Sequence, residues 1–166
     1  MKKLFIKSLV LAATGILLVI ACQSPVNKNT EQEVKDNKWL EEMTISKLQL
    51  GYRNGDYSVT DVVSAYLDRI IELDMNGPEL NSIIIVNPDA LQIAEELDKE
   101  MDAGKIRGPL HGIPVILKDN IDTFDKMPTT AGATVLMNSY PRSDSFVARK
   151  LREAGAVIIA KSNLSE

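Results

Sequence analysis

Apolar residues recur at the spacing of a helix in several stretches of the chain. In the clearest stretch, one helical face carries Val59, Val62, Val63, Tyr66, Leu67, Ile70 and Ile71. Ser58 precedes this face and Asp61 lies three residues later, a pattern that resembles a capping box at the start of a helix. The pattern therefore predicts a helix that begins after Ser58 and ends before Gly77.

Two further helices are predicted from their start and stop signals. Thr44 can cap a short helix that is closed by Gly51. Asn87 is followed by Pro88, a residue favoured at the first position of a helix, and this second helix should end at Gly104.

Short apolar runs rich in branched residues predict three buried strands, at 82–86, 113–117 and 156–160. Pro114 argues against a helix in the second run, because proline breaks a helix interior. A fourth helix is expected before the third strand, capped by Ser143 or Asp144, with Phe146 on its apolar face and Gly155 at its end. Alternating helices and strands predict an α/β fold in layers with crossover connections.

The first 24 residues follow a different pattern. Three lysines among residues 1–7 precede an apolar run from Leu9 to Ile20, and Cys22 follows the small residue Ala21. This arrangement is typical of a secretory signal peptide with a bacterial lipobox, in which cleavage leaves an acylated Cys22 as the new N-terminus. The alternative is an uncleaved membrane anchor, because the run is marginally long enough to span a bilayer.

The prediction divides the chain into a lipoprotein signal peptide (1–21), a flexible tether (22–40) and a folded domain (41–166). The tether is expected because its residues offer few apolar side chains whose burial could offset the loss of chain entropy. The protein would be exported and attached to the lipid bilayer of a bacterial membrane, on its periplasmic or surface side, by the acylated Cys22. That residue is the only cysteine, so no intramolecular disulfide is expected.

The charge balance excludes one class of partner. The net charge is −4, and removing residues 1–21 with their three lysines and no acids would make it −7. Proteins that bind nucleic acid usually carry a basic surface, so no nucleic-acid partner is expected. Attachment to a membrane would likewise depend on lipid and not on attraction to anionic headgroups.

Lys118 follows the strand predicted at 113–117, where an amine is expected to be poorly solvated. An ordinary lysine titrates near ~10.4, whereas a general base needs a pKa of roughly 7–8. That reduction corresponds to about 4 kcal/mol, which burial alone can impose. The alternative is an ordinary lysine that extends from the strand end into water.

Three motifs together carry a resemblance to a known family: GPLHGIPVILKDNID at 108–122, TTAG at 129–132 and LREAGAVIIAKSNLSE at 151–166. From about Thr44 onward the chain closely resembles the amidase signature family. The resemblance implies the N-terminal portion of that fold, a mixed β-sheet core covered by helices and incomplete at the C-terminus. Ala133 and Ala160 depart from the family pattern, where serine and glycine are usual, but both exchanges are between small residues.

The resemblance also implies a chemistry. Lys118 matches the base of a Ser–cis-Ser–Lys triad that hydrolyses a small carboxylic amide to an acid and ammonia or an amine, without a metal or organic cofactor. In that family, the two serines of the triad belong to a Gly/Ser-rich segment that would come after Glu166, the last of these residues. The 166 residues alone are therefore expected to be inactive.

Other candidate residues favour structural roles. His111 is the only histidine, and the chain has no Gly-x-Ser-x-Gly motif, so a positioning role is expected. Asp119, Asn120 and Asp122 lack the ligand spacing of a calcium loop and suggest a solvated turn. Gly132 either forms a turn or permits close backbone approach. None of five candidate serines has a nucleophile motif: Ser139, Ser143, Ser145, Ser162 and Ser165.

Two other functions remain open on the sequence. One is an amidotransferase A-type subunit of the same family, which releases ammonia for transamidation of charged tRNA, a cytoplasmic reaction that the predicted export disfavours. The other is a non-catalytic lipoprotein that uses a decayed amidase scaffold to bind partners.

Overall fold

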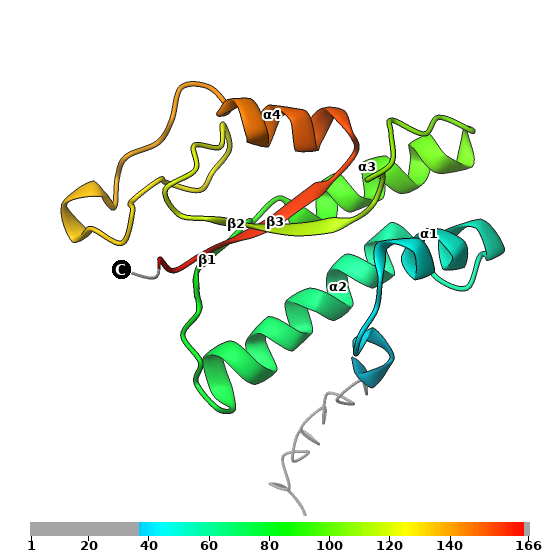
Figure 1. Ribbon diagram of the computed structural model, residues 1–166, viewed down its shortest axis with the longest axis horizontal. Helices are drawn as coiled ribbons and strands as arrows, with labels where there is room; N and C mark the ends of the chain where they lie inside the picture. The colour runs from blue at the N-terminus through cyan, green and yellow to red at the C-terminus, as the bar shows by residue number, and fades with distance from the viewer. Residues whose placement is uncertain (1–36, 165–166) are drawn as a thin grey trace, which may run out of the picture. The chain divides into compact units, whose positions relative to one another are not determined.

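The computed structural model describes residues 37–164 (Figure 1). The predicted signal peptide, Cys22 and most of the predicted tether lie outside the described residues. The elements in chain order are η1 (Asn37–Leu40), α1 (Ile45–Asn54), α2 (Val59–Arg69), η2 (Ile70–Asn76), β1 (Ile83–Val86), α3 (Ala90–Asp102), β2 (Pro114–Lys118), η3 (Thr134–Leu136), α4 (Phe146–Glu153) and β3 (Val157–Ser162). The elements η1 and η3 are 3₁₀-helices, and η2 is a π-helix.

The last four residues of the expected 22–40 tether belong to the fold. They form η1, in which Leu40 is buried. The Trp39 ring stacks on the ring of Tyr57, with centroids 5.1 Å apart. The sequence did not place the start of the fold at Asn37, because the preceding residues are polar and the contacts of this segment come mainly from one tryptophan and one leucine.

Local capping signals set the starts of α1 and α2 as expected. The Thr44 hydroxyl accepts a hydrogen bond from the Lys47 amide (3.2 Å), and Ser58 and Asp61 form the reciprocal capping box. The end of α1 differs from the prediction, because the helix continues through Gly51 to Asn54. Gly51 is needed there for space, since a Cβ atom would lie 2.1 Å from the Tyr57 ring.

The starts of α3 and α4 differ from the predictions. Helix α3 begins at Ala90 and not at Pro88, because the Asn87 side chain accepts from the Asp89 amide and donates to the Ile158 carbonyl. Helix α4 is capped by Ser145, whose hydroxyl accepts from the Ala148 amide (3.3 Å), and not by either residue before it.

The three strands form one mixed sheet in the order β1-β3-β2, which confirms the predicted α/β class. Strand β1 is antiparallel to β3, whereas β2 is parallel to β3 and reaches it through a crossover that contains α4. Helix α4 covers one face of the sheet, and α2 and α3 cover the other (Figure 1). The central strand β3 is therefore enclosed on both faces and along both edges.

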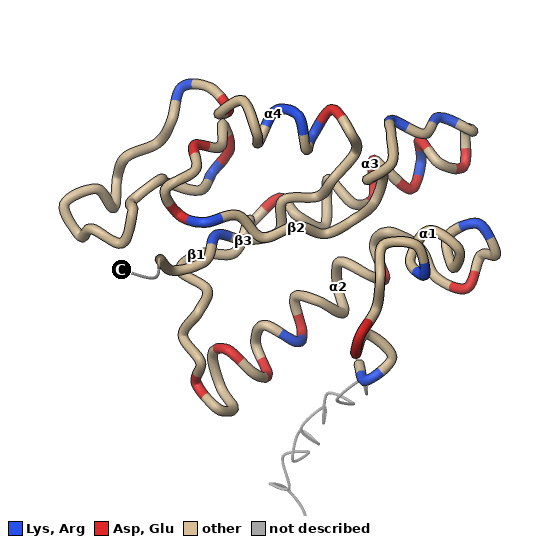
Figure 2. The backbone as a smooth tube through the Cα atoms, viewed as in Figure 1, with Lys and Arg blue, Asp and Glu red and all other residues tan. Residues whose placement is uncertain are grey.

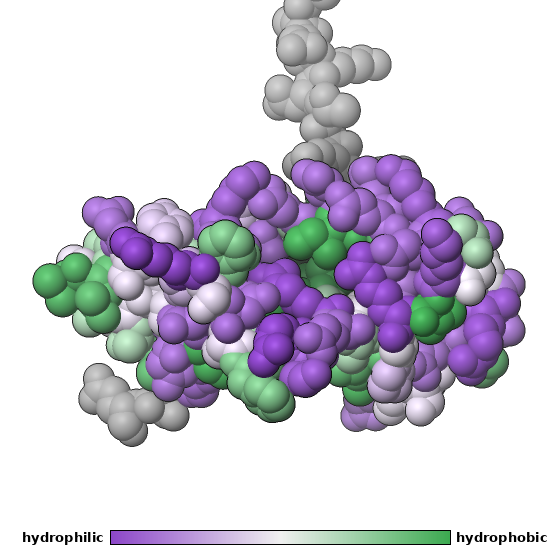
Figure 3. Space-filling view, turned by 90° about the horizontal axis from the view of Figure 1, so that it is seen from above, coloured by the Kyte–Doolittle hydropathy of each residue, from purple (hydrophilic) through white to green (hydrophobic). Residues whose placement is uncertain are grey.

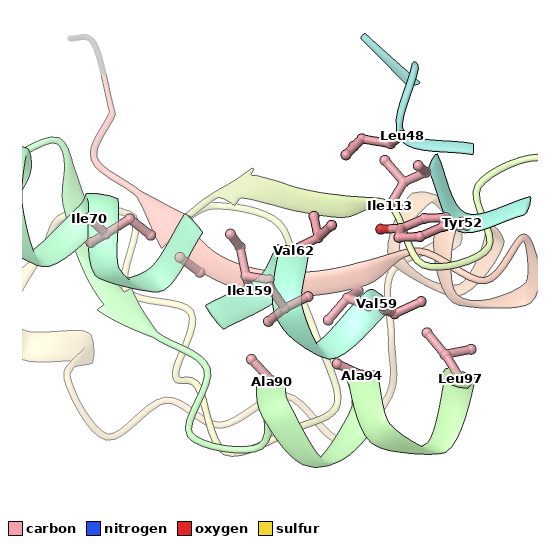
Figure 4. Packing of buried hydrophobic residues seen from close by; sticks show 13 residues of the cluster. Leu48, Tyr52, Val59, Val62, Ile70, Ala90, Ala94, Leu97, Ile113 and Ile159 are labelled. Carbon is pink, nitrogen blue, oxygen red and sulfur yellow. The ribbon is translucent and has the colours of Figure 1, made fainter. Parts of the chain in front are cut away.

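Side chains from α1, α2, α3 and β3 make up most of the larger of two hydrophobic clusters (Figure 4). Val59, Val62 and Ala94 are fully buried, and Ile159 is almost fully buried against them. Ile158 points to the opposite face of β3, where it packs in the smaller cluster with Leu117, Met127 and Ala148. The alternation of neighbouring residues along β3 thus supplies both layers of the core.

Some apolar residues remain on the surface, and Figure 3 shows them as separate patches among hydrophilic side chains. The most exposed large ones are Val135 (90%), Phe146 (70%) and Phe124 (67%). Phe146 was expected on the buried face of its helix, but only Ala148 of α4 is buried.

The turn between η2 and β1 depends on a buried carboxylate. Asp74 accepts hydrogen bonds from the amides of Ser82 (2.7 Å) and Ile83 (3.0 Å) and from the Ser82 hydroxyl. These bonds, led by the one from the hydroxyl, hold the pKa of Asp74 below its usual range despite the opposing effect of burial. The ionised form of Asp74 is therefore the one that stabilises the fold.

We expect this carboxylate to make stability depend on acid. Its contribution should be fully present above the ordinary aspartate pKa of about 4 and be lost as the pH falls through the lower value of the folded protein. Asp74→Asn should thus destabilise the domain at about pH 6 and have a smaller effect at about pH 2.5. Urea unfolding at both pH values measures this, with the exposed Asp56→Asn as control. An equal loss at both pH values would contradict the assignment.

Candidate functional site

The carboxyl ends of the parallel strands β2 and β3 lie next to each other. Lys118 on β2 is in register with Ser162 on β3, and the Asp119 amide donates to the Ser162 carbonyl (3.0 Å). Charged residues of both signs lie where β2 runs into the following loop (Figure 2). Open α/β sheets place their ligand sites at the carboxyl ends of their strands, so the ends of β2 and β3 are the candidate site.

Lys118 lies at the end of β2, as predicted, but its side chain is exposed. The expectation that it is poorly solvated is wrong for the described residues. The reason is the two-residue alternation of a strand, because Leu117 points into the smaller cluster while Ile116 and Lys118 share the other face. Strand β2 lies at the edge of the sheet, and this face of it is open to solvent, since Ile116 is 42% exposed.

Asp119, the next residue, is fully buried, so the prediction of a solvated turn is wrong for this residue. Its Oδ2 atom accepts hydrogen bonds from the Thr130 amide (3.1 Å) and the Thr130 hydroxyl. Within residues 37–164, its other oxygen, Oδ1, has no hydrogen-bond partner. Asn120 and Asp122 are both exposed, as a solvated turn requires.

Lys161, on the central strand, is a fully buried lysine. Its Nζ atom donates to the Pro128 carbonyl (2.9 Å) and to the Thr129 hydroxyl (2.7 Å). Burial lowers the pKa of Lys161, and the negative charges of Asp119, Asp125 and Asp122 act in the opposite direction. The site thus contains a buried lysine on β3 and a buried aspartate that directly follows the neighbouring strand β2.

His111 has the positioning role that its sequence context predicts. Its Nδ1 atom accepts from the Arg107 amide (3.2 Å), and Nε2 lies 3.1 Å from the Leu97 carbonyl, to which it donates in the corresponding tautomer. Gly155 packs directly on it, since a Cβ atom there would lie 2.7 Å from the His111 Cα. One ring nitrogen therefore binds helix α3, and the other binds the loop between α3 and β2.

The remaining candidates are structural in the described part of the chain. Gly132 has a φ of 74°, and a Cβ atom there would meet only ordinary contacts at 3.9 Å or more, so it serves as a turn residue. Ser145 caps α4. Ser165 lies outside the described residues.

Residues 37–164 contain no group of three or more His, Cys, Asp or Glu side chains that could hold a metal ion. No helix in the same residues combines the length and apolar character needed to cross a bilayer.

The burial of Lys161 and Asp119 has no local signal in the sequence. Lys161 interrupts the strand pattern and suggests a strand end, while Asp119 suggests a turn. Their positions in the LREAGAVIIAKSNLSE and GPLHGIPVILKDNID motifs were the only available signal. A motif marks such residues without indicating whether they contact solvent.

Comparisons with known proteins agree on one family. Residues 61–166 match the family described as Amidase. The chain is 50% identical over 130 residues to an amidase-like protein of Schizosaccharomyces pombe, covering 78% of this chain and 22% of the relative. It is 40% identical over 128 residues to the A-type subunit of the glutamyl-tRNA(Gln) amidotransferase of Alkaliphilus metalliredigens, covering 76% and 25%.

Solved structures give the same result. The peptide amidase of Stenotrophomonas maltophilia is 46% identical, with a TM-score of 0.73 over 76% of this chain and 26% of the other. An amidase family protein of Bacillus anthracis is 39% identical, with a TM-score of 0.74 over 78% and 26%. The chain thus spans about a quarter of the length of these proteins.

The buried lysine leads to a pH prediction. Because its pKa is lowered on folding, the folded chain releases the Lys161 proton at a lower pH than the unfolded chain does. Stability should therefore rise with pH between the folded value and the ordinary ~10.5, and Lys161→Met should lack this rise. Denaturant unfolding of both proteins at about pH 8 and about pH 10 compares the two slopes, and parallel slopes would contradict the prediction.

Proposed function

Because the chain belongs to the amidase family, we propose that the protein hydrolyses the C–N bond of a small carboxylic amide, with Lys118 as its base. The observation that carries this proposal is the position of Lys118 at the carboxyl end of β2, within the matched residues and beside the parallel strand β3. Strand ends in this arrangement present side chains to a ligand while the sheet keeps them in place.

In the proposed mechanism, the neutral amine of Lys118 takes a proton, through a bridging serine, from a nucleophilic serine. The nucleophile attacks the amide carbonyl and forms an acyl-enzyme, while backbone N–H groups stabilise the oxyanion. Lys118 returns the proton to the leaving nitrogen, and water then hydrolyses the acyl-enzyme. We propose that both serines belong to sequence that follows these 166 residues in the complete gene product.

The proposed base needs a less polar environment than residues 37–164 provide. Ile116 and Lys118 share an exposed face of an edge strand. The relatives are about three to three and a half times as long, and their further chain can cover this face. We propose that such a cover, packed on Ile116, removes water from the Lys118 amine and makes it a base.

The comparisons favour an amidase over an amidotransferase subunit. Identity is 50% to the amidase-like protein of Schizosaccharomyces pombe and 46% to the peptide amidase, against 40% to the amidotransferase. A peptide carboxamide is therefore the first substrate to assay, with glutamine and misacylated tRNA as the comparison. Turnover of glutamine with misacylated tRNA, but not of the peptide carboxamide, would support the amidotransferase. Turnover of neither substrate would support a decayed scaffold.

Removing the proposed base should abolish turnover. Lys118→Ala in the complete gene product should lower kcat/KM by a factor of about 10⁴ to 10⁶, because other triads lose about that much when one member is removed. Hydrolysis of a peptide carboxamide, followed by ammonia release, measures the effect. Lys126→Ala is the matched control, since that lysine is exposed and paired with Asp89.

Two results would contradict this role. A near-normal rate in the Lys118→Ala protein would make Lys118 structural. Turnover by residues 1–166 alone would show that catalysis does not need the two serines proposed to follow these residues.

We also propose that the protein is an exported lipoprotein attached to a bacterial membrane through Cys22. The support is the order of sequence features, in which three early lysines, an apolar run and Ala21-Cys22 follow one another. A single acyl chain binds a membrane only marginally, whereas the several chains of a lipoprotein anchor it stably.

Lipidation gives a direct test. Cells grown with labelled palmitate should produce a labelled protein that lacks residues 1–21 and sediments with membranes, and Cys22→Ala should lose the label. Ser24→Ala is the control and should keep it. An unlabelled, uncleaved protein in the membrane fraction would favour the simple anchor.

A further inference from the structure

The long connection between β2 and α4 contains one regular element, the short helix η3. Residues 128–131 of this connection nevertheless have a defined place, because each of them is hydrogen-bonded either to Lys161 on β3 or to Asp119, directly after β2. We call them the 128–131 loop. The side chains of Lys161 and Asp119 and the backbone carbonyl of Asp119 hold the loop in place.

Lys161 binds the first half of the loop. Its Nζ atom donates to the Pro128 carbonyl at 2.9 Å and to the Thr129 hydroxyl at 2.7 Å. The lysine is fully buried in the central strand, so its side chain has little freedom and is shielded from water. Hydrogen bonds from a buried amine are stronger than the same bonds at a surface.

Asp119 binds the second half. Its carboxylate accepts from the amide and hydroxyl of Thr130, and its backbone carbonyl accepts from the Ala131 amide at 3.0 Å. Its own amide donates to the Ser162 carbonyl at 3.0 Å. The residue directly after Lys118 is therefore fixed through both backbone groups and its side chain.

The two halves depend on each other, because the loop is only four residues long and its anchors are close: Lys161 lies on β3, and Asp119 directly follows the adjacent, parallel strand β2. Leu117 is in register with Lys161, and Lys118 with Ser162. A loop released from Lys161 would hold Thr130 and Ala131 less firmly. Asp119 would then keep only its bond to Ser162 and lose the loop contacts that help to set the backbone direction at the end of β2.

We propose that Lys161 is a positioning residue for amide hydrolysis: together with Asp119, it fixes the 128–131 loop against the strand ends and so sets the direction in which Lys118 leaves the sheet. This inference rests on the proposed function. Lys161 itself is enclosed in the core and does not contact substrate. Its effect is on geometry, and a displacement of about 1 Å in a reacting group can cost as much as a hundredfold in rate.

The test compares four variants of the complete gene product. Lys161→Met removes the donor and keeps the apolar stem, and Lys161→Arg keeps a charged donor. Thr129→Val removes one acceptor without touching the core, and Lys126→Met is the exposed control from the same connection. For each, kcat and KM for a peptide carboxamide are measured well below the unfolding temperature, together with amide hydrogen exchange of the 128–131 loop and α2.

Lys161→Met should lower kcat about ten- to a hundredfold and change KM less than about threefold, because positioning acts on the reacting group and not on substrate binding. Exchange should accelerate in the 128–131 loop and stay unchanged in α2. Thr129→Val should lower kcat by a smaller factor. Lys161→Arg should retain more of the wild-type kcat than Lys161→Met does. Lys126→Met should change neither kcat nor loop exchange.

A purely structural role predicts a different result. It would lower the unfolding temperature of Lys161→Met while leaving kcat and loop exchange unchanged, and this would overturn the inference. If Lys161→Met fails to fold, unchanged kcat and loop exchange in Thr129→Val would also overturn it. If the wild-type protein hydrolyses no amide, the proposed function fails, whereas the exchange data still decide whether Lys161 holds the loop.

Discussion

Burial of β3 is the constraint on which the rest of the structure depends. This strand pairs with β1 on one edge and β2 on the other, and its faces are covered by α2 and α3 on one side and α4 on the other. Every residue from Val157 to Lys161 is consequently buried. A polar group on this strand must therefore find partners inside the protein.

Lys161 satisfies that requirement by binding a loop. Its amine meets a carbonyl and a hydroxyl, while the carboxylate of Asp119 binds the next residue of the same loop. A buried charge is costly unless it is paired or hydrogen-bonded, and the loop supplies those bonds. The same contacts thus reduce the cost of burial and give an otherwise irregular connection a fixed conformation.

Two lysines at the ends of neighbouring strands accordingly have opposite environments. Lys118 lies on the open face of an edge strand, and Lys161 lies in the middle of the sheet. Their neighbours in sequence are similar, since each follows an apolar run. The exposed amine is accessible, as a reacting group must be, and the enclosed one has the rigidity that suits a support.

The sequence alone determined the features that depend on neighbouring residues. The capping box at Ser58 and the cap at Thr44 form within four residues, so their patterns were sufficient, and the three strands follow from local runs of branched side chains. The motifs around Lys118 likewise identified the family.

Only the tertiary structure decided which strand is central, and hence which lysine is buried. It also decided that Gly51 continues a helix and that Asp119 is enclosed, because both depend on contacts with residues distant in sequence or across a turn. Solvent access is a property of the assembled layers, and a linear pattern of apolar and polar residues cannot specify the order of strands in a sheet.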